Sequence, residues 1–299
     1  MAEGYDEFAF LADNAADAGL ARPGRPAVRR TTVALPDGRS LSALVWGQTP
    51  PEVVVVHGGA QNAHTWDTVA LALDRPLVAL DLPGHGHSDW RADHDYRPAT
   101  IADDLAVAVE ELAPHADLVV GMSLGGLSAL VLAVRHPSLV RRLMLVDITP
   151  GVDATKTRAI TEFVSGPQRF ASFDEILERT IAHNPTRSRS SLRRGVAHNA
   201  VRGADGTWTW RWDPTRTMGR SLDGGVDFAR LWDDLSALAV PLTLLRGAES
   251  PVVDDADVVE LRRRRPDVEV VVVDGAGHSI QGDRPVETAA LIAERLRTP

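Results

Sequence analysis

The stretch LVVGMSLGGLSALVLA, residues 118–133, decides the fold of this chain. Leu118–Val120 form an apolar run typical of a buried strand, and Leu124–Val134 has the small and aliphatic residues of a buried helix. Only three residues lie between these two runs, so the chain must turn sharply with Ser123 at its apex. This order of strand, tight turn and helix predicts an α/β protein that carries a serine on the turn.

The composition is ordinary for a soluble globular protein with an ample core. The chain has 299 residues, of which 44% are hydrophobic and 24% are charged. It lacks an apolar run of about 18 residues, which a membrane-spanning helix would need, and its first residues do not have the pattern of a signal peptide. The absence of cysteine excludes disulfides and thiolate metal sites. We therefore expect a cytoplasmic protein.

The charge balance argues against a nucleic-acid or membrane partner. The net charge is −9, from 32 basic and 41 acidic residues, whereas those partners select basic surfaces. Five arginines nevertheless cluster within sixteen residues, at positions Arg187, Arg189, Arg193, Arg194 and Arg202. We interpret this cluster as a solvated helix face.

Strand and helix patterns alternate along most of the chain. Strands are expected at residues 31–35, 41–46, 53–57, 77–81, 117–121, 142–147, 241–246 and 268–273, and helices at 65–73, 100–112, 124–136, 254–264 and 284–296. The sequence Pro36-Asp37-Gly38 is a turn signal between the first two strands. The later strands are nearly continuous runs of valine and leucine, which suits a parallel sheet covered on both faces. The pattern predicts a doubly wound, mostly parallel α/β sheet.

The alternation breaks at Thr149 and resumes near residue 229. The intervening residues 149–228 contain helix-like stretches at 174–182 and 189–199, and tryptophans alternate along the segment GTWTWRWDP at 206–214. This alternation predicts a strand face or a small hairpin. We expect residues 31–148 and 229–299 to form the core, 149–228 to be a mainly helical cap, and 1–30 to be a loosely attached leader.

Gly121-Met122-Ser123-Leu124-Gly125 matches the G-x-S-x-G nucleophile elbow, between a strand and a helix as that motif requires. The serine takes strained backbone angles, so glycines are needed two residues away on either side. The helix N-terminus beside the serine also favours developing negative charge. These features predict that Ser123 is a nucleophile.

A base and an oxyanion hole are expected at the same edge of the sheet. His278, in VVVVDGAGHSIQGDRP at 270–285, follows a late strand, and the carboxyl ends of parallel strands share one edge. The N–H groups of Gly59 and Leu124 are the expected oxyanion pair. His57 is expected to brace the Gly59 loop rather than to transfer protons.

The Gly-rich stretch DLPGHGHS at 81–88 lacks the spacing and the lysine of a phosphate-binding loop. His85 and His87 have no carboxylate-rich partner set, so a structural turn is favoured over a metal site. We expect neither a cofactor nor a metal.

Together these motifs resemble the α/β-hydrolase superfamily. The resemblance rests on His-Gly-Gly at 57–59, DLPGHGHS at 81–88, GMSLGG at 121–126 and GAGH at 275–278. It implies an eight-stranded sheet, a cap inserted after the sixth strand, and a catalytic triad in the chain order serine, acid, histidine.

The identity of the triad acid stays open between two residues. Members of the superfamily most often place an aspartate after the seventh strand, but Ser250 stands where it is expected and Glu249 lies one position early. A minority place the acid after the sixth strand, where this chain has Asp147. We prefer Asp147 and keep Glu249 as the alternative. Either residue would hold the tautomer of His278 and stabilise its imidazolium.

The serine at position 123 argues against haloalkane dehalogenases and epoxide hydrolases, which resemble this chain but need a carboxylate nucleophile. We therefore predict a cofactor-free hydrolase that forms an acyl-enzyme on a small-molecule ester or lactone. Alternatives with the same triad are a C–C bond hydrolase, an acyltransferase and a perhydrolase. A ligand-binding relative with little turnover is an alternative of another class.

Overall fold

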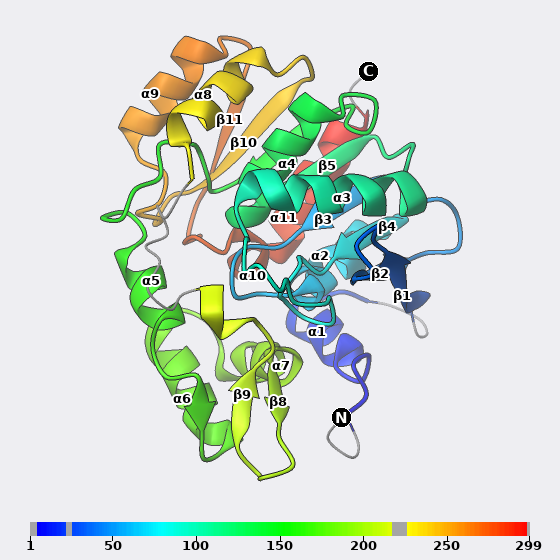
Figure 1. The fold of residues 1–299 in the computed structure, drawn as a ribbon, viewed down its shortest axis with the longest axis vertical. Coiled ribbons are helices and arrows are strands. Elements are labelled where there is room, and N and C mark those ends of the chain that lie inside the picture. Colours follow the sequence, from blue (N-terminus) through cyan, green and yellow to red (C-terminus); the bar gives the residue numbers. More distant parts are fainter. Residues whose placement is uncertain (1–4, 22–25, 217–225, 298–299) are drawn as a thin grey trace.

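The computed structural model describes residues 5–21, 26–216 and 226–297. Its centre is an eight-stranded sheet in the order β1-β2-β4-β3-β5-β6-β10-β11 (Figure 1). The strands are β1 (Val28–Ala34), β2 (Ser40–Trp46), β3 (Val53–Val56), β4 (Leu77–Leu80), β5 (Leu118–Met122), β6 (Leu143–Val146), β10 (Leu242–Gly247) and β11 (Glu269–Val273). Strand β2 runs antiparallel to β1 and β4, and the other pairs are parallel. The predicted mostly parallel sheet is confirmed, and β1 begins three residues before its predicted start.

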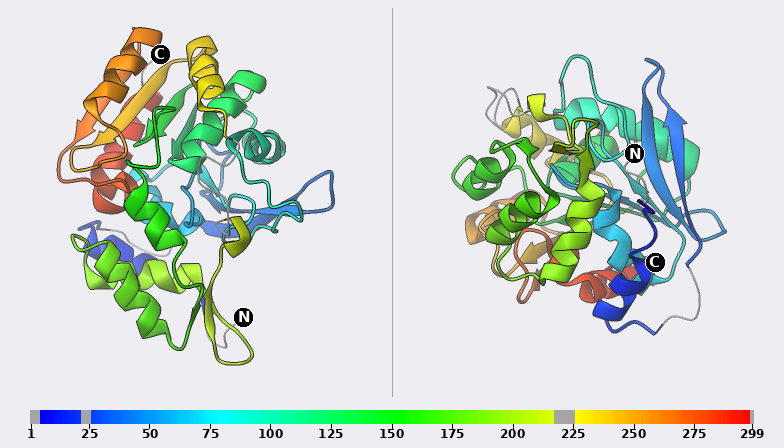
Figure 2. Two further views of the ribbon diagram at one scale, coloured as in Figure 1. Left: turned by 60° about the vertical axis from the view of Figure 1, so that its left-hand side comes forward. Right: turned by 90° about the horizontal axis from the view of Figure 1, so that it is seen from below.

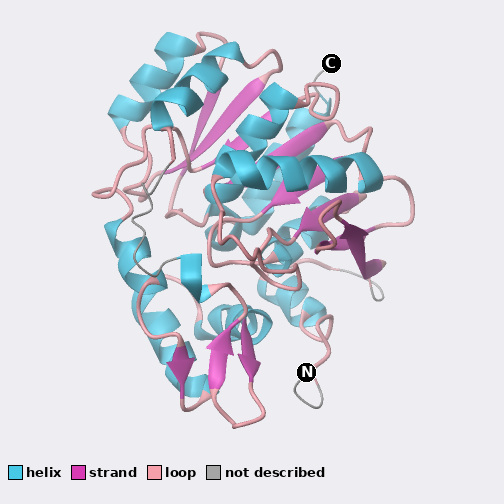
Figure 3. Cartoon of the chain, in the orientation of Figure 1, coloured by secondary structure: helices cyan, strands magenta, loops and turns pink. Residues whose placement is uncertain are grey.

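Helices cover both faces of this sheet (Figure 3). One apolar core contains residues of α3 (Pro98–Leu112), α4 (Leu124–Arg135), α8 (Phe228–Ala237) and α9 (Asp255–Arg264). The other contains residues of α1 (Leu11–Asp17), α2 (Asp67–Leu73), α10 (Ile280–Asp283) and α11 (Pro285–Arg297). Strands β3 to β6 are buried along their whole length, as their continuous valine and leucine runs require. In the described parts of the chain, no helix is long and apolar enough to cross a membrane.

The chain between β6 and α8 forms a separate layer, which lies below the central sheet in Figure 1. It contains α5 (Arg158–Val164), β7 (Arg169–Phe170), α6 (Phe173–His183), α7 (Arg189–Asn199), β8 (Ala200–Arg202), β9 (Trp208–Trp210) and the short 3-10 helix η2 (Pro214–Arg216). Strand β9 lies between β7 and β8, and the stacked rings of Trp210 and Trp212 are 4.3 Å apart. The predicted alternation of tryptophans thus falls on a strand of a small antiparallel sheet. Residues 217–225 of the predicted cap lie outside the described residues.

The N-terminal segment packs closely, contrary to the expectation of a loosely attached leader. Leu11 and Ala15 of α1 are buried in the core that also contains α2. These residues are four positions apart, so they lie on one face of the helix. Asp17 forms an ion pair with Arg194 of α7, and Figure 2 shows α1 beside the inserted layer. The segment therefore joins the core to the insertion.

A buried carboxylate holds the first strand and two loops together. Asp81 follows β4 and accepts hydrogen bonds from Arg30 Nη1 at 2.8 Å, the Ala63 amide at 2.7 Å and the His87 amide at 3.1 Å. Ala63 opens the 3-10 helix η1 (Ala63–Trp66). Burial alone would raise the pKa of Asp81, but the Arg30 guanidinium and these donors hold it below its ordinary value. Asp81 is therefore an ionised part of the core.

We predict that Asp81→Ala lowers the free energy of unfolding by about 3–5 kcal/mol, because Arg30 loses its buried carboxylate and keeps only Glu7, while the Ala63 and His87 amides lose their acceptor. Asp103→Ala removes an exposed partner of Arg135 and serves as the matched control. Urea unfolding of both variants measures the difference. A loss for Asp81→Ala no larger than that for Asp103→Ala would contradict the structural role of Asp81.

Candidate active site

Ser123 lies on a strained turn between β5 and α4. Its backbone has φ 52° and ψ −120°, a conformation that residues with a side chain rarely adopt. The neighbouring glycines permit the close approach of strand and helix: a Cβ on Gly121 would lie 2.6 Å from the Gly125 carbonyl oxygen. A Cβ on Gly125 would lie 2.4 Å from the His57 carbonyl oxygen. A side chain at either glycine would therefore collide with neighbouring backbone, as the sequence predicts for the elbow.

His278 lies in the loop between β11 and α10. Its Nδ1 is 2.8 Å from Asp147 Oδ2. Asp147 follows β6 directly, is fully buried and has φ 50°. Because an ionised carboxylate only accepts hydrogen bonds, His278 carries its proton on Nδ1 and keeps a lone pair on Nε2. This tautomer makes Nε2 the basic atom of the pair.

Three groups donate hydrogen bonds to the Asp147 carboxylate. The Gly247 amide donates to Oδ1 at 2.9 Å, and the Ser250 hydroxyl and His278 both donate to Oδ2. The Ser250 oxygen also accepts from the Val252 amide at 3.1 Å. Ser250 thus occupies the position where the family resemblance implies an acid. Its hydroxyl instead holds Asp147, which follows the neighbouring strand β6.

Glu249, the alternative acid, is solvent-exposed. Its amide donates to the Ala276 carbonyl oxygen at 3.0 Å, which joins the loop after β10 to the loop of His278. His278 Nδ1 donates its hydrogen bond to Asp147 instead. The geometry therefore favours Asp147. The sequence analysis did not predict that Ser250 donates a hydrogen bond to Asp147. The signal for this contact was a hydroxyl at the position of the expected acid.

Gly59 and Leu124 border the same cavity as Ser123 and His278. Leu124 belongs to the first turn of α4, where amide N–H groups have no acceptor within the helix. His57 is buried beneath this loop: its Nε2 accepts from the Leu82 amide at 2.9 Å, and its Nδ1 donates to the Gly58 carbonyl oxygen at 2.7 Å. These bonds agree with the bracing role predicted for His57.

Two further side chains fasten the loop of Gly59. Gln61 Oε1 accepts from the Gly58 amide at 3.4 Å, and its Nε2 donates to Ser279 Oγ at 3.2 Å. Asn199, at the end of α7, donates to the Ala60 carbonyl oxygen at 2.7 Å. Ala60 has φ 62°, so an external contact helps to hold its unusual backbone. No local pattern marks either residue, because their partners are 139 and 218 positions away.

The cavity beside Ser123 has a volume of about 1300 Å³. Its apolar lining comes from both the core and the inserted layer and includes Leu127, Ile148, Ile160, Phe163, Leu192, Val196, Trp210, Trp212 and Phe228. Its polar lining includes Asn62, Thr65, Asn184, Arg187, Ser191 and Gln281. The cavity is therefore amphipathic and larger than a short ester requires.

The arginine cluster is not uniformly solvated, which corrects the sequence interpretation. Arg189, Arg193 and Arg202 are exposed, as expected. Arg194 is buried and donates to Asn14 and Asp17 of α1, and Arg187 borders the cavity. The interpretation as one solvated face is wrong for these two residues. The sequence could not separate them, because the leader and cavity that cover them come from distant parts of the chain.

His85 and His87 belong to the turn after β4. His85 is buried, and its Nδ1 donates to the Pro83 carbonyl oxygen at 3.0 Å. Burial and the nearby Arg30 charge lower the pKa of His87 to about 4, so this ring is neutral at physiological pH. The bond of His85 and the neutral ring of His87 agree with a structural turn.

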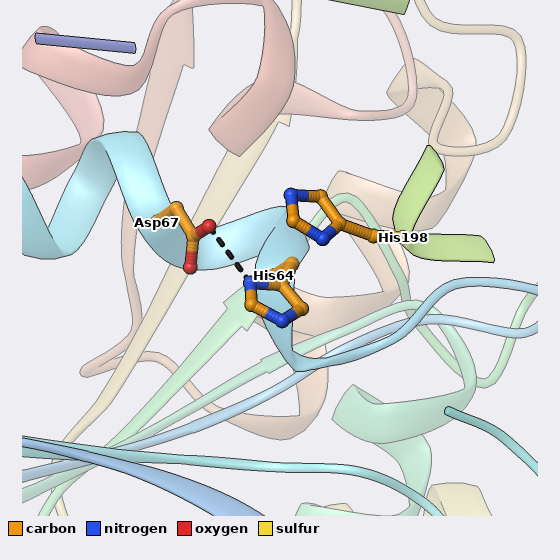
Figure 4. A group of neighbouring side chains, drawn as sticks. All are labelled: His64, Asp67 and His198. Carbon is orange, nitrogen blue, oxygen red and sulfur yellow. Dashed lines mark hydrogen bonds and ion pairs between the residues drawn. The ribbon is translucent and has the colours of Figure 1, made fainter. Parts of the chain in front are cut away.

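A second polar cluster has the composition of a metal site (Figure 4). Ligand atoms of His64, Asp67 and His198 lie within 4.8 Å of one another. His64 Nδ1 is already 2.9 Å from Asp67 Oδ2, and the two imidazole rings stack with centroids 3.8 Å apart. Parallel rings cannot both direct a lone pair at one ion without turning, so this arrangement is unsuited to a metal.

The pKa of His64 also opposes a metal, because a protonated imidazole has no lone pair to donate. Burial by itself would lower the pKa of His64, but Asp67 and Glu7 raise it to about 9. Burial, with the His64 and Arg30 charges, holds the pKa of His198 well below its ordinary value. Tyr5 Oη lies 2.6 Å from His198 Nδ1. We interpret the cluster as an ion-pair network that joins the N-terminal segment, the core and α7.

Known proteins resemble this chain along most of its length. The sequence pattern described as the alpha/beta hydrolase fold matches residues 51–285. The esterase Rv0045c of Mycobacterium tuberculosis is 47% identical over 289 residues, which cover 94% of this chain and 93% of that protein. A solved structure of that esterase superposes with a TM-score of 0.88 and covers 99% of this chain and all of that one. The 3-hydroxybutyrate-oligomer hydrolase of Cupriavidus necator is 30% identical, over 78% of this chain and 85% of that protein.

We predict that Asp147→Asn lowers kcat by about 10³–10⁴-fold, because an amide in place of the carboxylate disfavours the required tautomer of His278. Glu249→Gln, the matched control, is expected to change kcat by less than about twofold, since its side chain is exposed. Steady-state hydrolysis of a chromogenic ester measures both. The reverse result would assign the acid to Glu249.

We further predict that Ser250→Ala lowers kcat about tenfold while the protein stays folded, because the Asp147 carboxylate loses one hydrogen-bond donor. Ser250→Thr retains a hydroxyl and should restore most of the activity. The comparison uses kcat for one ester together with circular dichroism. Equal activity of the alanine variant and the wild type would show that Ser250 does not position Asp147.

Proposed function

Because the chain belongs to the α/β hydrolase fold family, we propose that it is a carboxylic-ester hydrolase that works through Ser123, His278 and Asp147. The observation that carries this proposal is the hydrogen bond between His278 Nδ1 and the buried Asp147, in a cavity that Ser123 also borders. The high identity to an esterase along nearly the whole chain supports the same class of reaction.

The reaction begins with the attack of Ser123 Oγ on the ester carbonyl carbon. His278 Nε2 takes the hydroxyl proton, and Asp147 stabilises the imidazolium that forms. The carbonyl oxygen becomes an oxyanion, which the N–H groups of Gly59 and Leu124 stabilise. The positive end of the α4 dipole lies at the same place and favours that charge.

The intermediate then breaks its C–O bond to the alcohol. His278 gives its proton to the leaving oxygen, and the acyl group stays on Ser123. A water molecule attacks this acyl-enzyme while His278 again acts as the base, and the carboxylic acid is released. These steps use water, the side chains of this chain and its backbone N–H groups.

The cavity supports a substrate with a substantial apolar part. Leu127 and Ile148 of the core and Ile160 and Phe163 of the insertion give one part of the cavity an aliphatic and aromatic lining. We therefore propose that the inserted layer acts as a cap and that the acyl group of an ester or a lactone binds against these side chains.

Other reactions use the same three residues, namely C–C bond hydrolysis, acyl transfer to an acceptor other than water, and perhydrolysis. Ester hydrolysis is favoured because a protein named as an esterase is 47% identical over 94% of this chain. A binding protein with little turnover would not need a buried acid held by three hydrogen-bond donors, so this alternative is less favoured.

We predict that a fluorophosphonate forms a single adduct on Ser123. The Ser123→Ala variant should form no adduct, and its kcat should be lower by about 10⁴-fold or more. Intact mass and peptide mapping locate the adduct, and a series of esters measures turnover. Ser128→Ala is the matched control, since Ser128 is buried in α4 and bonds the Leu124 carbonyl oxygen. Absence of both labelling and ester turnover in the folded protein would refute the proposed function.

A further inference from the structure

Arg187 places a guanidinium at the border of the catalytic cavity. It lies between α6 and α7, and its side chain is 24% exposed. Nη2 donates to Ser191 Oγ at 3.0 Å, whereas Nε is buried without a hydrogen-bond partner in the part of the chain that the structure describes. Asp283 Oδ1 is 3.9 Å from Nε, too far for a hydrogen bond. Arg187 therefore has capacity for another ligand.

Neighbouring arginines of the same segment are satisfied differently. Arg194 donates to Asn14 at 2.7 Å and pairs with Asp17 at 2.5 Å. Arg189 is exposed and pairs with Glu178 at 2.6 Å. Arg187 has Asp283 at an ion-pair distance of 3.9 Å, without a hydrogen bond to it, and has only partial access to water.

Such a group is costly unless something completes its hydrogen bonds. A buried cation loses its hydration, and a buried N–H without an acceptor loses a hydrogen bond as well. Burial accordingly lowers the pKa of Arg187, and Asp283 only partly opposes this effect. Asp283 is itself engaged, because its Oδ2 accepts from the Gly277 amide at 2.9 Å. A bound anion would supply what the protein does not.

The position of Arg187 indicates which part of a substrate it would meet. A Cβ on Gly282 would lie 2.9 Å from Arg187 Nη1, so the guanidinium lies against α10. Asp283, the neighbouring residue, bonds the amide that precedes His278. Arg187 is therefore on the His278 side of the cavity. Since His278 delivers a proton to the departing oxygen, the alcohol part of an ester lies toward that side.

We propose that Arg187 binds a carboxylate on the alcohol part of the ester, so that the preferred substrates release a hydroxy acid. This inference rests on the proposed ester hydrolysis. A guanidinium presents two parallel N–H groups that match the two oxygens of a carboxylate, and burial strengthens such a charge-assisted pair. Hydrolysis then converts one ester and one water molecule into a carboxylic acid, from the acyl part, and the hydroxy acid.

The test compares two esters that differ in charge and little in shape. One is the hexanoate ester of 3-hydroxypropanoate, and the other is the hexanoate ester of 3-hydroxypropanamide. For the wild type we expect kcat/KM to be about tenfold or more higher for the carboxylate ester. Arg187→Gln should lower kcat/KM for that ester about 10–100-fold, mainly through KM, and should change the amide ester by less than about twofold.

Two variants and one binding measurement control this test. Arg189→Gln removes an exposed charge from the same segment and should leave both esters unaffected. Arg187→Lys keeps the charge without the planar fork, so it should restore only part of the preference. In the wild type, 3-hydroxypropanoate should inhibit competitively at concentrations at which 3-hydroxypropanamide does not, a readout that needs no variant.

Each result has a distinct meaning. An equal loss on both esters in Arg187→Gln, or no preference for the carboxylate ester in the wild type, would overturn the Arg187 site and leave ester hydrolysis intact. Failure of the wild type to hydrolyse either ester, without labelling of Ser123, would refute the proposed function and the inference together. Selective loss on the carboxylate ester with product inhibition supports the site.

Discussion

The close approach of α4 to β5 at Ser123 is the constraint on which the rest of the structure depends. The strand must end, reverse and enter a helix within a few residues, and this is possible only where Gly121 and Gly125 leave room for the backbone. The same turn gives Ser123 its positive φ and brings the first amides of α4 to the edge of the sheet. Strain in the backbone thus places a hydroxyl and potential oxyanion donors together, and buried valine and leucine strands on either side keep the turn in place.

Two adjacent strands provide Asp147 and the hydroxyl that holds it. Strands β6 and β10 pair in parallel, so the loops that follow them emerge at the same edge. Asp147 after β6 faces His278, and Ser250 after β10 donates a hydroxyl to the same carboxylate oxygen. The proposed chemistry needs a buried carboxylate at His278 Nδ1 but does not need it to come from a particular strand. A hydroxyl beside that carboxylate therefore preserves the arrangement when the acid lies one strand away.

The inserted layer and the N-terminal segment complete the cavity from outside the sheet. Asn199 contacts the carbonyl oxygen of Ala60, in the loop that holds Gly59, so the insertion is connected to the proposed oxyanion site. Helix α1 pairs with Arg194 of the same insertion, and the His64 network adds a second connection. Arg187 stands apart because it borders the cavity while its Nε is buried without an acceptor among the described residues. The cavity beside Ser123 is therefore lined by the core, the insertion and the N-terminal segment together.

The sequence by itself determined the order of strands and helices, the elbow, and the candidates Ser123, His278 and Asp147. Those features depend on local patterns: valine and leucine runs, turn residues, and glycines beside a serine. It preferred Asp147 and kept Glu249 as the alternative, and it missed Ser250, Gln61, Asn199 and the packing of α1. It also treated Arg187 and Arg194 as solvated. Only the tertiary structure brings these side chains to their partners, because each contact joins residues far apart in the chain, and burial and hydrogen bonding exist only after the sheet and the insertion have come together.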